Sequence, residues 1–369
     1  MKINICVGGR FHAANLANAL DANYKDKIIY TSSPKKNWPK KIRKNITFIP
    51  MPFSILAYLF KFNNPRILKY IDRIIFDYFL SIIIRKSDIC HIWAGYGYKT
   101  ISKIKKLDPK TKIILERSCP HINFQKTILK NESKKYNLKF YFDSKSDVKR
   151  QLYEYEKSDF ILTCSNYSKN SFKNYKNLFK KTKVIYLPSN VEIPKISKIN
   201  KQETIIGFIG DFGLRKGIHC LLNAFEKSKS KNLLYLKLPK LDTKNKLLLN
   251  NCLKKEFIKI KGYYDSISDF YNEIDFLCIP SIDEGFGVVA IEALQHKVQI
   301  IIREGVGSSE ILTSLDNVKK FKDEKDLKKI FDKIYASNIK LKFNSKHFFD
   351  NQKYIRKYNK DICHLYSKL

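Results

Sequence analysis

Two glutamates eight residues apart, Glu284 and Glu292, have the chemistry and spacing of a ligand site. They lie in residues 280–294, after an apolar run at 276–279 that is typical of a buried parallel strand, and a helical pattern follows a loop with two glycines. A helix that begins behind such a loop presents free N–H groups at the carboxyl edge of a sheet, where anionic ligands bind. The two carboxylates would repel a phosphate, but they accept hydrogen bonds well from hydroxyl groups. The stretch therefore predicts a site for a sugar attached to a nucleotide.

The alternative is an ordinary strand-to-helix turn in which Gly285 and Gly287 adopt positive φ and both glutamates are solvated. The whole string favours the site: PS at 280–281, EGFG at 284–287 and EAL at 292–294 resemble the donor-site signature of retaining glycosyltransferases of family 4. The resemblance implies that Glu284 binds sugar hydroxyls, that Glu292 binds the ribose, and that Gly285, Phe286 and Gly287 line the donor.

A second group of candidates follows the strand expected at residues 204–210. Arg215 and Lys216 stand directly before an amphipathic helix that is expected to run through residue 227, and cations there oppose the helix dipole unless an anion lies between them. A diphosphate is the obvious anion, and these cations would offset the charge of the leaving group. In the family an arginine usually follows the strand glycine, where this chain has Asp211, so we expect Arg215 to substitute for it. Gly210 and Gly213 complete the expected donor loop.

A third loop, residues 304–310, follows the strand expected at 299–302. The resemblance implies that the backbone amides of this loop help to hold the phosphates, with Glu310 at its end. The glycine loop that the family usually has within the lysine-rich residues 233–260 is replaced by Leu238-Pro239-Lys240. The nucleobase pocket is therefore not placed by the sequence.

The first half of the chain offers acceptor-side candidates. The expected strand at residues 3–7 leads into Gly8, Gly9, Arg10 and His12, where the resemblance implies a loop facing the cleft, with Arg10 or His12 on an acceptor phosphate. The alternative is a tight turn with both side chains in solvent. The expected strand at 113–117 delivers His121, which in general is a structural residue. Its position matches the histidine that the family presents to the transferred sugar.

The length of 369 residues suits two domains, and apolar runs alternate with helical patterns as in α/β proteins. The resemblance implies a GT-B fold: two Rossmann-like domains that face each other across a cleft. We expect an N-terminal acceptor-side domain at 1–192, a linker at 193–203, a C-terminal nucleotide-sugar domain at 204–346, and a helix at 347–369 that crosses back to the first domain.

The formal charge of +36, with 71 Lys and Arg against 35 Asp and Glu, favours anionic partners: nucleic acid, a membrane surface or phosphorylated substrates. The alternative is an AT-rich genome, which inflates Lys, Asn, Ile, Tyr and Phe together. The 8 scattered cysteines are typical of reduced cytosolic thiols rather than of disulfides or zinc. No signal peptide is expected before the first strand, and the apolar run at 71–84 is too short and charged to span a bilayer.

From these residues we expect a retaining, metal-independent glycosyltransferase that uses a nucleotide-diphosphate sugar as co-substrate and needs no cofactor. Glycan or lipid-linked glycan acceptors of envelope polysaccharide synthesis suit the basic surface, with peripheral contact to an anionic membrane from a basic helical region at 52–85. A solvated basic face is the alternative for that region. The rival functions are a sugar-nucleotide epimerase or phosphorylase of the same fold and a nucleic-acid-binding protein. The sequence has no lysine-linked cofactor motif that would favour the epimerase or phosphorylase. It also has no recognisable binding module that would favour the nucleic-acid-binding protein.

Overall fold

The computed structural model describes residues 1–53, 66–189, 203–238, 255–262, 264, 266–312, 315–337 and 350–369. They form two compact units: Met1–Phe124 with Tyr141–Leu187 and Tyr354–Leu369, and Gln125–Phe140 with Pro188–Lys353. The second unit therefore includes a short segment from the first half of the chain, Gln125–Phe140. Of the expected linker at 193–203, only residue 203 lies within the described residues, and the expected start of the tail at 347 lies outside them.

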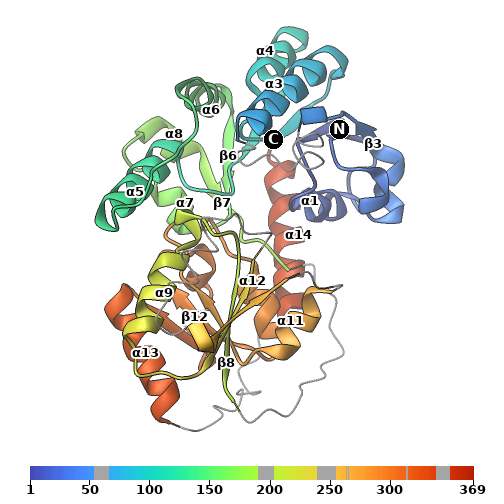
Figure 1. Ribbon diagram of the computed structural model, residues 1–369. Coiled ribbons are helices and arrows are strands. Elements are labelled where there is room, and N and C mark those ends of the chain that lie inside the picture. Colours follow the sequence, from blue (N-terminus) through green and yellow to red (C-terminus); the bar gives the residue numbers. More distant parts are fainter. Residues whose placement is uncertain are drawn as a thin grey trace. The chain divides into compact units, whose positions relative to one another are not determined.

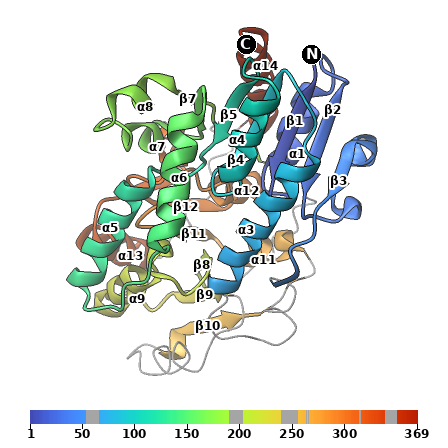
Figure 2. The ribbon, with the colours of Figure 1, turned by 90° about the horizontal axis from the view of Figure 1, so that it is seen from above.

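The first unit is built on a seven-stranded sheet in the order β3-β2-β1-β4-β5-β6-β7 (Figures 1 and 2). All of its pairings are parallel. The central strands are buried on both faces, which is why they appear in the sequence as continuous apolar runs. The strand order reverses between β1 and β4, and the loops after a reversal diverge and leave room for a ligand. The strands are β1 (Ile3–Val7), β2 (Lys27–Thr31), β3 (Ile46–Phe48), β4 (Ile89–Trp93), β5 (Lys112–Glu116), β6 (Phe160–Thr163) and β7 (Thr182–Val184).

Helices join these strands. They are α1 (Ala13–Leu20), α3 (Arg66–Ile83), α4 (Tyr98–Leu107), α5 (Ile122–Lys135), α6 (Lys145–Lys157), α7 (Asn166–Asn170) and α8 (Lys176–Lys181). The basic stretch after β2 forms two short 3₁₀ turns, η1 (Lys35–Asn37) and η2 (Lys40–Asn45), around the buried Trp38. The last helix, α14 (Asn351–Ser367), falls mostly within the first unit. Its Tyr358, Ile362 and Tyr366, spaced four residues apart, form one buried face.

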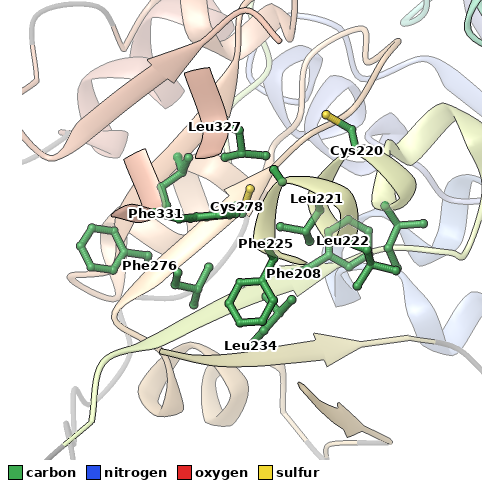
Figure 3. Packing of buried hydrophobic residues seen from close by; sticks show 14 of the residues in the cluster. Phe208, Cys220, Leu221, Leu222, Phe225, Leu234, Phe276, Cys278, Leu327 and Phe331 are labelled. Carbon is green, nitrogen blue, oxygen red and sulfur yellow. The ribbon is translucent and has the colours of Figure 1, made fainter. Parts of the chain in front are cut away.

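The second unit has a six-stranded parallel sheet in the order β10-β9-β8-β11-β12-β13. Its core lies between the sheet and helices α9 and α13, where Phe208, Phe225, Phe276 and Phe331 pack together (Figure 3). The strands are β8 (Ile205–Ile209), β9 (Leu233–Lys237), β10 (Ile258–Lys261), β11 (Phe276–Ile279), β12 (Gln299–Arg303) and β13 (Val318–Phe321). The helices are α9 (Ile218–Lys227), α11 (Ile267–Glu273), α12 (Val289–Gln295) and α13 (Glu324–Ala336), with 3₁₀ turns η3 (Leu214–Lys216), η4 (Lys255–Phe257) and η5 (Gly307–Glu310).

Several elements expected from the sequence are confirmed in place. The buried strand before the glutamates is β11, and the helix after Arg215 and Lys216 is α9, which ends at Lys227. The predicted helical region at 52–85 contains α3, while its residues 54–65 lie outside the described part. Within the part of the chain that is described, no helix is long and apolar enough to cross a membrane.

Candidate functional site

The loop between β11 and α12 carries the candidate donor residues at the carboxyl edge of the second sheet. Gly287 has a φ of +82°, and a Cβ there would lie 2.9 Å from Val306 Cγ1 and 3.5 Å from Glu284 Cγ. Gly285 is not among the residues with positive φ, so only one of the two glycines is required for backbone conformation. Phe286 is buried beneath the loop. Neither glutamate is solvated as in an ordinary turn, because both carboxylates take hydrogen bonds from other elements.

Glu284 is the centre of a compact charge cluster. Arg215 Nη1 lies 3.1 Å from Glu284 Oε2 and also donates to the carbonyl of Asp283 at 3.1 Å. Lys216 Nζ donates to the same carboxylate oxygen. Burial raises the pKa of Glu284, but the charges of Arg215 and Lys216 and their hydrogen bonds outweigh it, so the pKa lies below its ordinary value. The carboxylate is therefore ionised at neutral pH and holds both cations together.

The short turn η3 is fixed against this loop by its backbone. Ile282 donates its N–H to the carbonyl of Arg215 at 2.9 Å. Gly217, the residue between η3 and α9, has a φ of +68°, and a Cβ there would lie 2.0 Å from the carbonyl oxygen of Pro280. Only glycine fits at this position. The Lys216-Gly217 pair thus brings the start of α9 against the end of β11, and this contact places both cations on Glu284.

The cations before α9 do have an anion near them, as expected, but in this structure it comes from the chain itself. The sequence predicts a diphosphate there, and Glu284 as a sugar ligand. Among the described residues, Asp211, which stands where the family usually has an arginine, is exposed and has no salt bridge. A Cβ on Gly213 would lie 2.6 Å from Asp211 Oδ1, so the glycine allows Asp211 to fold back over the loop. On Gly210, a Cβ would lie 3.3 Å from Lys216 Cγ.

Glu292 lies on α12 and is held by a neighbouring helix. Tyr271 of α11 donates its hydroxyl to Glu292 Oε2 at 3.0 Å, and burial raises the pKa of Glu292. His296 bonds through Nδ1 to the backbone carbonyl of Glu292 at 2.7 Å, and its ring centroid lies 4.8 Å from that of Tyr271. Glu292 Oε2 is thus fixed, which leaves Oε1 to accept hydroxyl hydrogen bonds.

The loop after β12 is tied to the glutamate loop by backbone hydrogen bonds. Gly307 N–H donates to the carbonyl of Glu284 at 3.1 Å and Ser308 N–H to that of Phe286 at 2.7 Å. The N–H groups of Val306 and Ser309 are also bonded within the loop. In this conformation these four amides have no free hydrogen for a phosphate. Phosphate binding by this loop stays a prediction. Glu310 ends η5 and is half-buried.

Two residues that the sequence did not single out complete this region. Gln125 of α5, which belongs to the second unit, donates through Nε2 to Asp283 Oδ2 at 2.5 Å. Asp283 is buried, with only 1% of its surface exposed. The position of Asp283 directly before Glu284 was a signal in the sequence. No signal pointed to Gln125, because 158 residues separate it from Asp283.

The glycine loop of the first unit packs tightly after β1. A Cβ on Gly8 would lie 1.8 Å from Tyr96 Cε1, and the carbonyls of Gly8 and Gly9 accept from Ser32 and Thr31 at 2.5 and 2.7 Å. Arg10 is exposed. His12 is not in open solvent: its side chain is 14% exposed, and Nε2 lies 3.1 Å from Glu116 Oε1.

Glu116, at the end of β5, organises a buried network that the sequence did not predict. Its Oε2 lies 3.2 Å from His91 Nε2, and His91 Nδ1 lies 2.7 Å from the hydroxyl of Tyr366. Burial raises the pKa of Glu116, but the charge of His12 and hydrogen bonds from both histidines bring it down to about 2. Because the carboxylate accepts, His91 carries its proton on Nε2 and Tyr366 donates to Nδ1. The signal in the sequence was the position of Glu116, a charged residue directly at the end of an apolar strand.

His121 lies in an aromatic pocket of the first unit rather than at an open surface. Its ring centroid is 4.1 Å from Tyr175, 5.0 Å from Phe172 and 5.1 Å from Tyr155, and none of its surface is exposed. Burial and then the charge of Arg117 lower the pKa of His121 to about 4. The N–H of Asn123 donates to His121 Nδ1 at 3.2 Å, so Nε2 carries the proton. Contact between His121 and a sugar stays a prediction.

The family comparison supports the reading of the second unit. Residues 189–353 match the model of the family described as Glycosyl transferases group 1. This part of the chain, less than half of its length, is similar to that family. The group 1 segment contains the Glu284 cluster, Glu292 and η5, so the resemblance seen in the sequence is confirmed at the level of group 1. The family number 4 stays a prediction.

Similar proteins extend this result. The capsular polysaccharide biosynthesis glycosyltransferase CapM of Staphylococcus aureus is 32% identical over 155 residues, which make up 40% of this chain and 40% of that protein. The matched part thus spans less than half of either protein. The solved structure of Anabaena HepE in complex with UDP aligns over 100% of both chains, with a TM-score of 0.65 at 14% identity. The lipopolysaccharide outer core galactosyltransferase WaaB, in apo form, aligns over 100% of both chains with a TM-score of 0.60 at 13% identity. At such identities the likeness shows the fold, and it confirms the predicted α/β GT-B class.

Proposed function

We propose that this chain is a retaining glycosyltransferase that moves a sugar from a UDP- or GDP-sugar to a glycan or lipid-linked glycan. The observation that carries the proposal is the cluster of Glu284, Arg215 and Lys216 at the carboxyl edge of the second sheet, inside the group 1 segment. Two cations on one carboxylate make a site that a diphosphate can enter by replacing the carboxylate as their partner. Glu284 then becomes free to accept hydroxyl hydrogen bonds from the sugar.

The proposed reaction balances without a cofactor. The bond between the anomeric carbon and the diphosphate oxygen breaks, and the acceptor oxygen forms its bond on the same face of the sugar. The leaving phosphate takes the proton of the acceptor hydroxyl. Arg215 and Lys216 stabilise the negative charge that develops on the diphosphate, and Glu292 holds the ribose through Oε1. No step requires a metal ion.

The relatives and the formal charge support the proposed acceptor class. CapM is described as acting in capsular polysaccharide biosynthesis and WaaB as acting on the lipopolysaccharide outer core. Together with the formal charge of +36, this favours an acceptor that carries phosphate groups in envelope polysaccharide synthesis, at the inner face of the plasma membrane. HepE binds UDP in its solved structure, which makes UDP the first nucleotide to test. On the acceptor side, the loop of Gly8, Gly9, Arg10 and His12 is proposed to meet the acceptor.

The stereochemistry of the reaction tests the proposal. The protein is incubated with α-linked UDP-sugars and GDP-sugars, with water as the acceptor, and the first anomer released is identified by proton NMR. We expect release of the α-anomer from one donor, together with its nucleoside diphosphate. Release of the β-anomer first would contradict retention, and no release from any donor would contradict transfer.

A matched pair of variants connects the reaction to the cluster. Lys216→Gln removes a cation from the leaving group, and we expect the rate of donor cleavage to fall about a hundredfold or more. The control is Lys229→Gln, an exposed lysine of the same unit that is not among the ion-pair partners of Glu284. Equal rates for the two variants would show that the cluster does not take part.

A further inference from the structure

The outer surface of α3 in the first unit exposes a group of large apolar side chains. Tyr78, Phe79, Ile82 and Ile83 are exposed to 48, 47, 58 and 42%, well above what a packed helix face shows. Positions i, i+1, i+4 and i+5 of a helix lie on the same side. We call these four residues the apolar face of α3. A cluster of this kind marks an interaction site more often than a single exposed apolar residue does.

A row of lysines borders this face. Lys99, Lys103 and Lys106 lie at positions i, i+4 and i+7 of α4, so they share one side of that helix, and all three are exposed. Lys99 Nζ lies 4.8 Å from the ring centroid of Tyr78, which joins the row to the apolar face. The salt bridges among the described residues involve none of these three lysines. Their charges are therefore available to an anionic partner.

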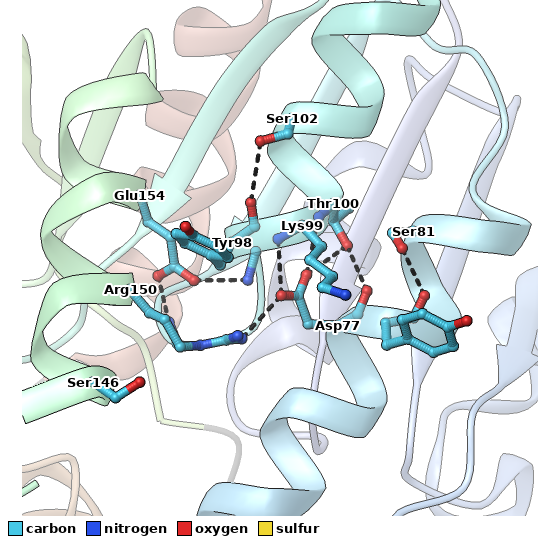
Figure 4. A network of polar contacts seen from close by, with 12 residues as sticks. Asp77, Ser81, Tyr98, Lys99, Thr100, Ser102, Ser146, Arg150 and Glu154 are labelled. Atoms are coloured by element: carbon cyan, nitrogen blue, oxygen red, sulfur yellow. Dashed lines mark hydrogen bonds and ion pairs between the residues drawn. The ribbon is translucent and has the colours of Figure 1, made fainter. Parts of the chain in front are cut away.

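The two helices are held in a fixed register by buried polar contacts. Asp77 of α3 accepts from the N–H groups of Lys99 and Thr100 at 2.9 and 3.0 Å, and Arg150 of α6 donates to it at 2.9 Å (Figure 4). Glu154 of α6 accepts from the loop before α4 at 2.6 and 2.8 Å. The apolar face and the lysine row are thus presented together on a rigid support.

Between α3, α4 and α6 the surface forms a pocket of about 250 Å³, and the three lysines line it. Its other polar groups are hydroxyls: Ser102 Oγ and the hydroxyl of Tyr153 lie 2.6 Å apart on its wall. Ammonium and hydroxyl groups around a hollow of this size suit a phosphate group.

We propose that this surface docks on a lipid bilayer that contains anionic lipids. Phe79, Ile82 and Ile83 enter the boundary between headgroups and acyl chains, and the lysine row contacts lipid phosphates, one of them in the pocket. Lysine suits this role because its stem lies along apolar surface while its charge reaches the headgroups. A protein partner is less favoured, because lysine is depleted at protein interfaces. The inference does not depend on the reaction proposed above.

Vesicle co-sedimentation of the full chain tests the inference. Vesicles of phosphatidylcholine alone are compared with vesicles that also contain phosphatidylglycerol, at low and at high salt. We expect binding to the anionic vesicles only. The triple variant Lys99→Gln, Lys103→Gln, Lys106→Gln should lose about fivefold in partitioning per lysine, or about a hundredfold in all.

A charge-matched control separates this surface from the basic character of the whole chain. Lys173→Gln, Lys176→Gln, Lys180→Gln removes three exposed lysines near α8, in the same unit, and should keep the binding. Equal loss in the control would overturn the proposal, as would equal binding to both kinds of vesicle or no binding to either.

The apolar contribution is tested separately. Phe79→Gln with Ile82→Gln should remove the part of the binding that remains at high salt. Phe48→Gln with Tyr141→Gln, which replaces two residues exposed to 47 and 60% elsewhere in the unit, should not. If high salt abolishes binding of the unaltered chain, the apolar face does not insert. Donor cleavage by each variant is measured in the absence of vesicles, so that failure of docking and failure of the proposed activity are distinguished.

Discussion

At the scale of single residues, Glu284 can pair either with the two cations or with the hydroxyls of a bound sugar. In the structure its carboxylate holds Arg215 and Lys216, and its pKa is low because of them. A bound diphosphate would attract the same cations with more charge, so we expect it to displace the carboxylate. Arg215 and Lys216 would then offset phosphate charge while Glu284 turns to the sugar. The ion pair thus keeps the site assembled when no donor is bound.

The contact of Gly217 with Pro280 gives the first prediction. Gly217→Ala places a Cβ at 2.0 Å from a carbonyl oxygen and forces φ of +68° on alanine. We expect the free energy of unfolding to fall by about 1 to 3 kcal/mol or more, measured by urea denaturation. The control is Gly262→Ala, because a Cβ there meets nothing within 4 Å. Equal stability of the two variants would show that α9 does not depend on this close contact.

His121 gives a prediction for the dependence of stability on pH. Its pKa is about 4 in the folded chain against 6.5 for an ordinary histidine, so the unfolded chain binds the proton first as the pH falls. The contribution of His121 to stability is complete above pH 6.5 and is lost as the pH falls from 6.5 to 4. The shift corresponds to roughly 3 kcal/mol.

The measurement compares variants over that pH range. His121→Phe should flatten the decline in the free energy of unfolding between these two pH values, whereas His364→Gln, at an exposed histidine of α14, should leave it unchanged. An unchanged slope in His121→Phe would mean that the ring is not buried as described.

At the scale of elements, each sheet carries its candidate residues on loops at the carboxyl ends of the strands. In the second unit the loops after β8, β11 and β12 are bonded to one another through Arg215, Glu284 and Gly307. In the first unit the loop after β1 and the end of β5 meet at His12 and Glu116. Parallel sheets place such loops together, so residues far apart in sequence become neighbours.

The helix α14 supplies a prediction at this scale. Ile362 is fully buried on the same face as Tyr358 and Tyr366, and the hydroxyl of Tyr366 reaches His91. Ile362→Ala should lower the free energy of unfolding by about 2 to 5 kcal/mol, because it leaves a cavity. Lys360→Ala, exposed on the same helix, should change it by about 0.5 kcal/mol or less. Similar values for the two variants would show that α14 is not packed through this face.

At the scale of the whole molecule, the sequence predicts elements better than partners. The strand β11 and the helix α9 were expected within a residue of their bounds, because apolar runs and periodicity are local properties. The pairing of Glu284 with Lys216 was not expected, since 68 residues separate them and only the approach of η3 to β11 brings them together. The burial of His121 among aromatic rings was missed for the same reason.

Part of the formal charge of +36 lies in the lysine row of α4, which the sequence did not single out. The sequence placed the membrane-facing basic residues on the region of α3 instead. In the structure, Arg73 of α3 is paired with Asp147 at 2.7 Å. The arrangement of charge in the fold therefore indicates a partner surface that composition alone did not locate.

The central claim is a nucleotide-sugar site in the second unit, and thermal unfolding with nucleotides tests it most directly. The protein is heated with UDP, GDP, ADP, TDP, CMP and bare oligonucleotides, and the series is repeated with Glu292→Ala and with Glu256→Ala, an exposed glutamate of the same unit, as the control. The account predicts that one nucleoside diphosphate raises the unfolding temperature and that only Glu292→Ala abolishes the effect. Stabilisation by oligonucleotides and by no nucleotide would contradict it.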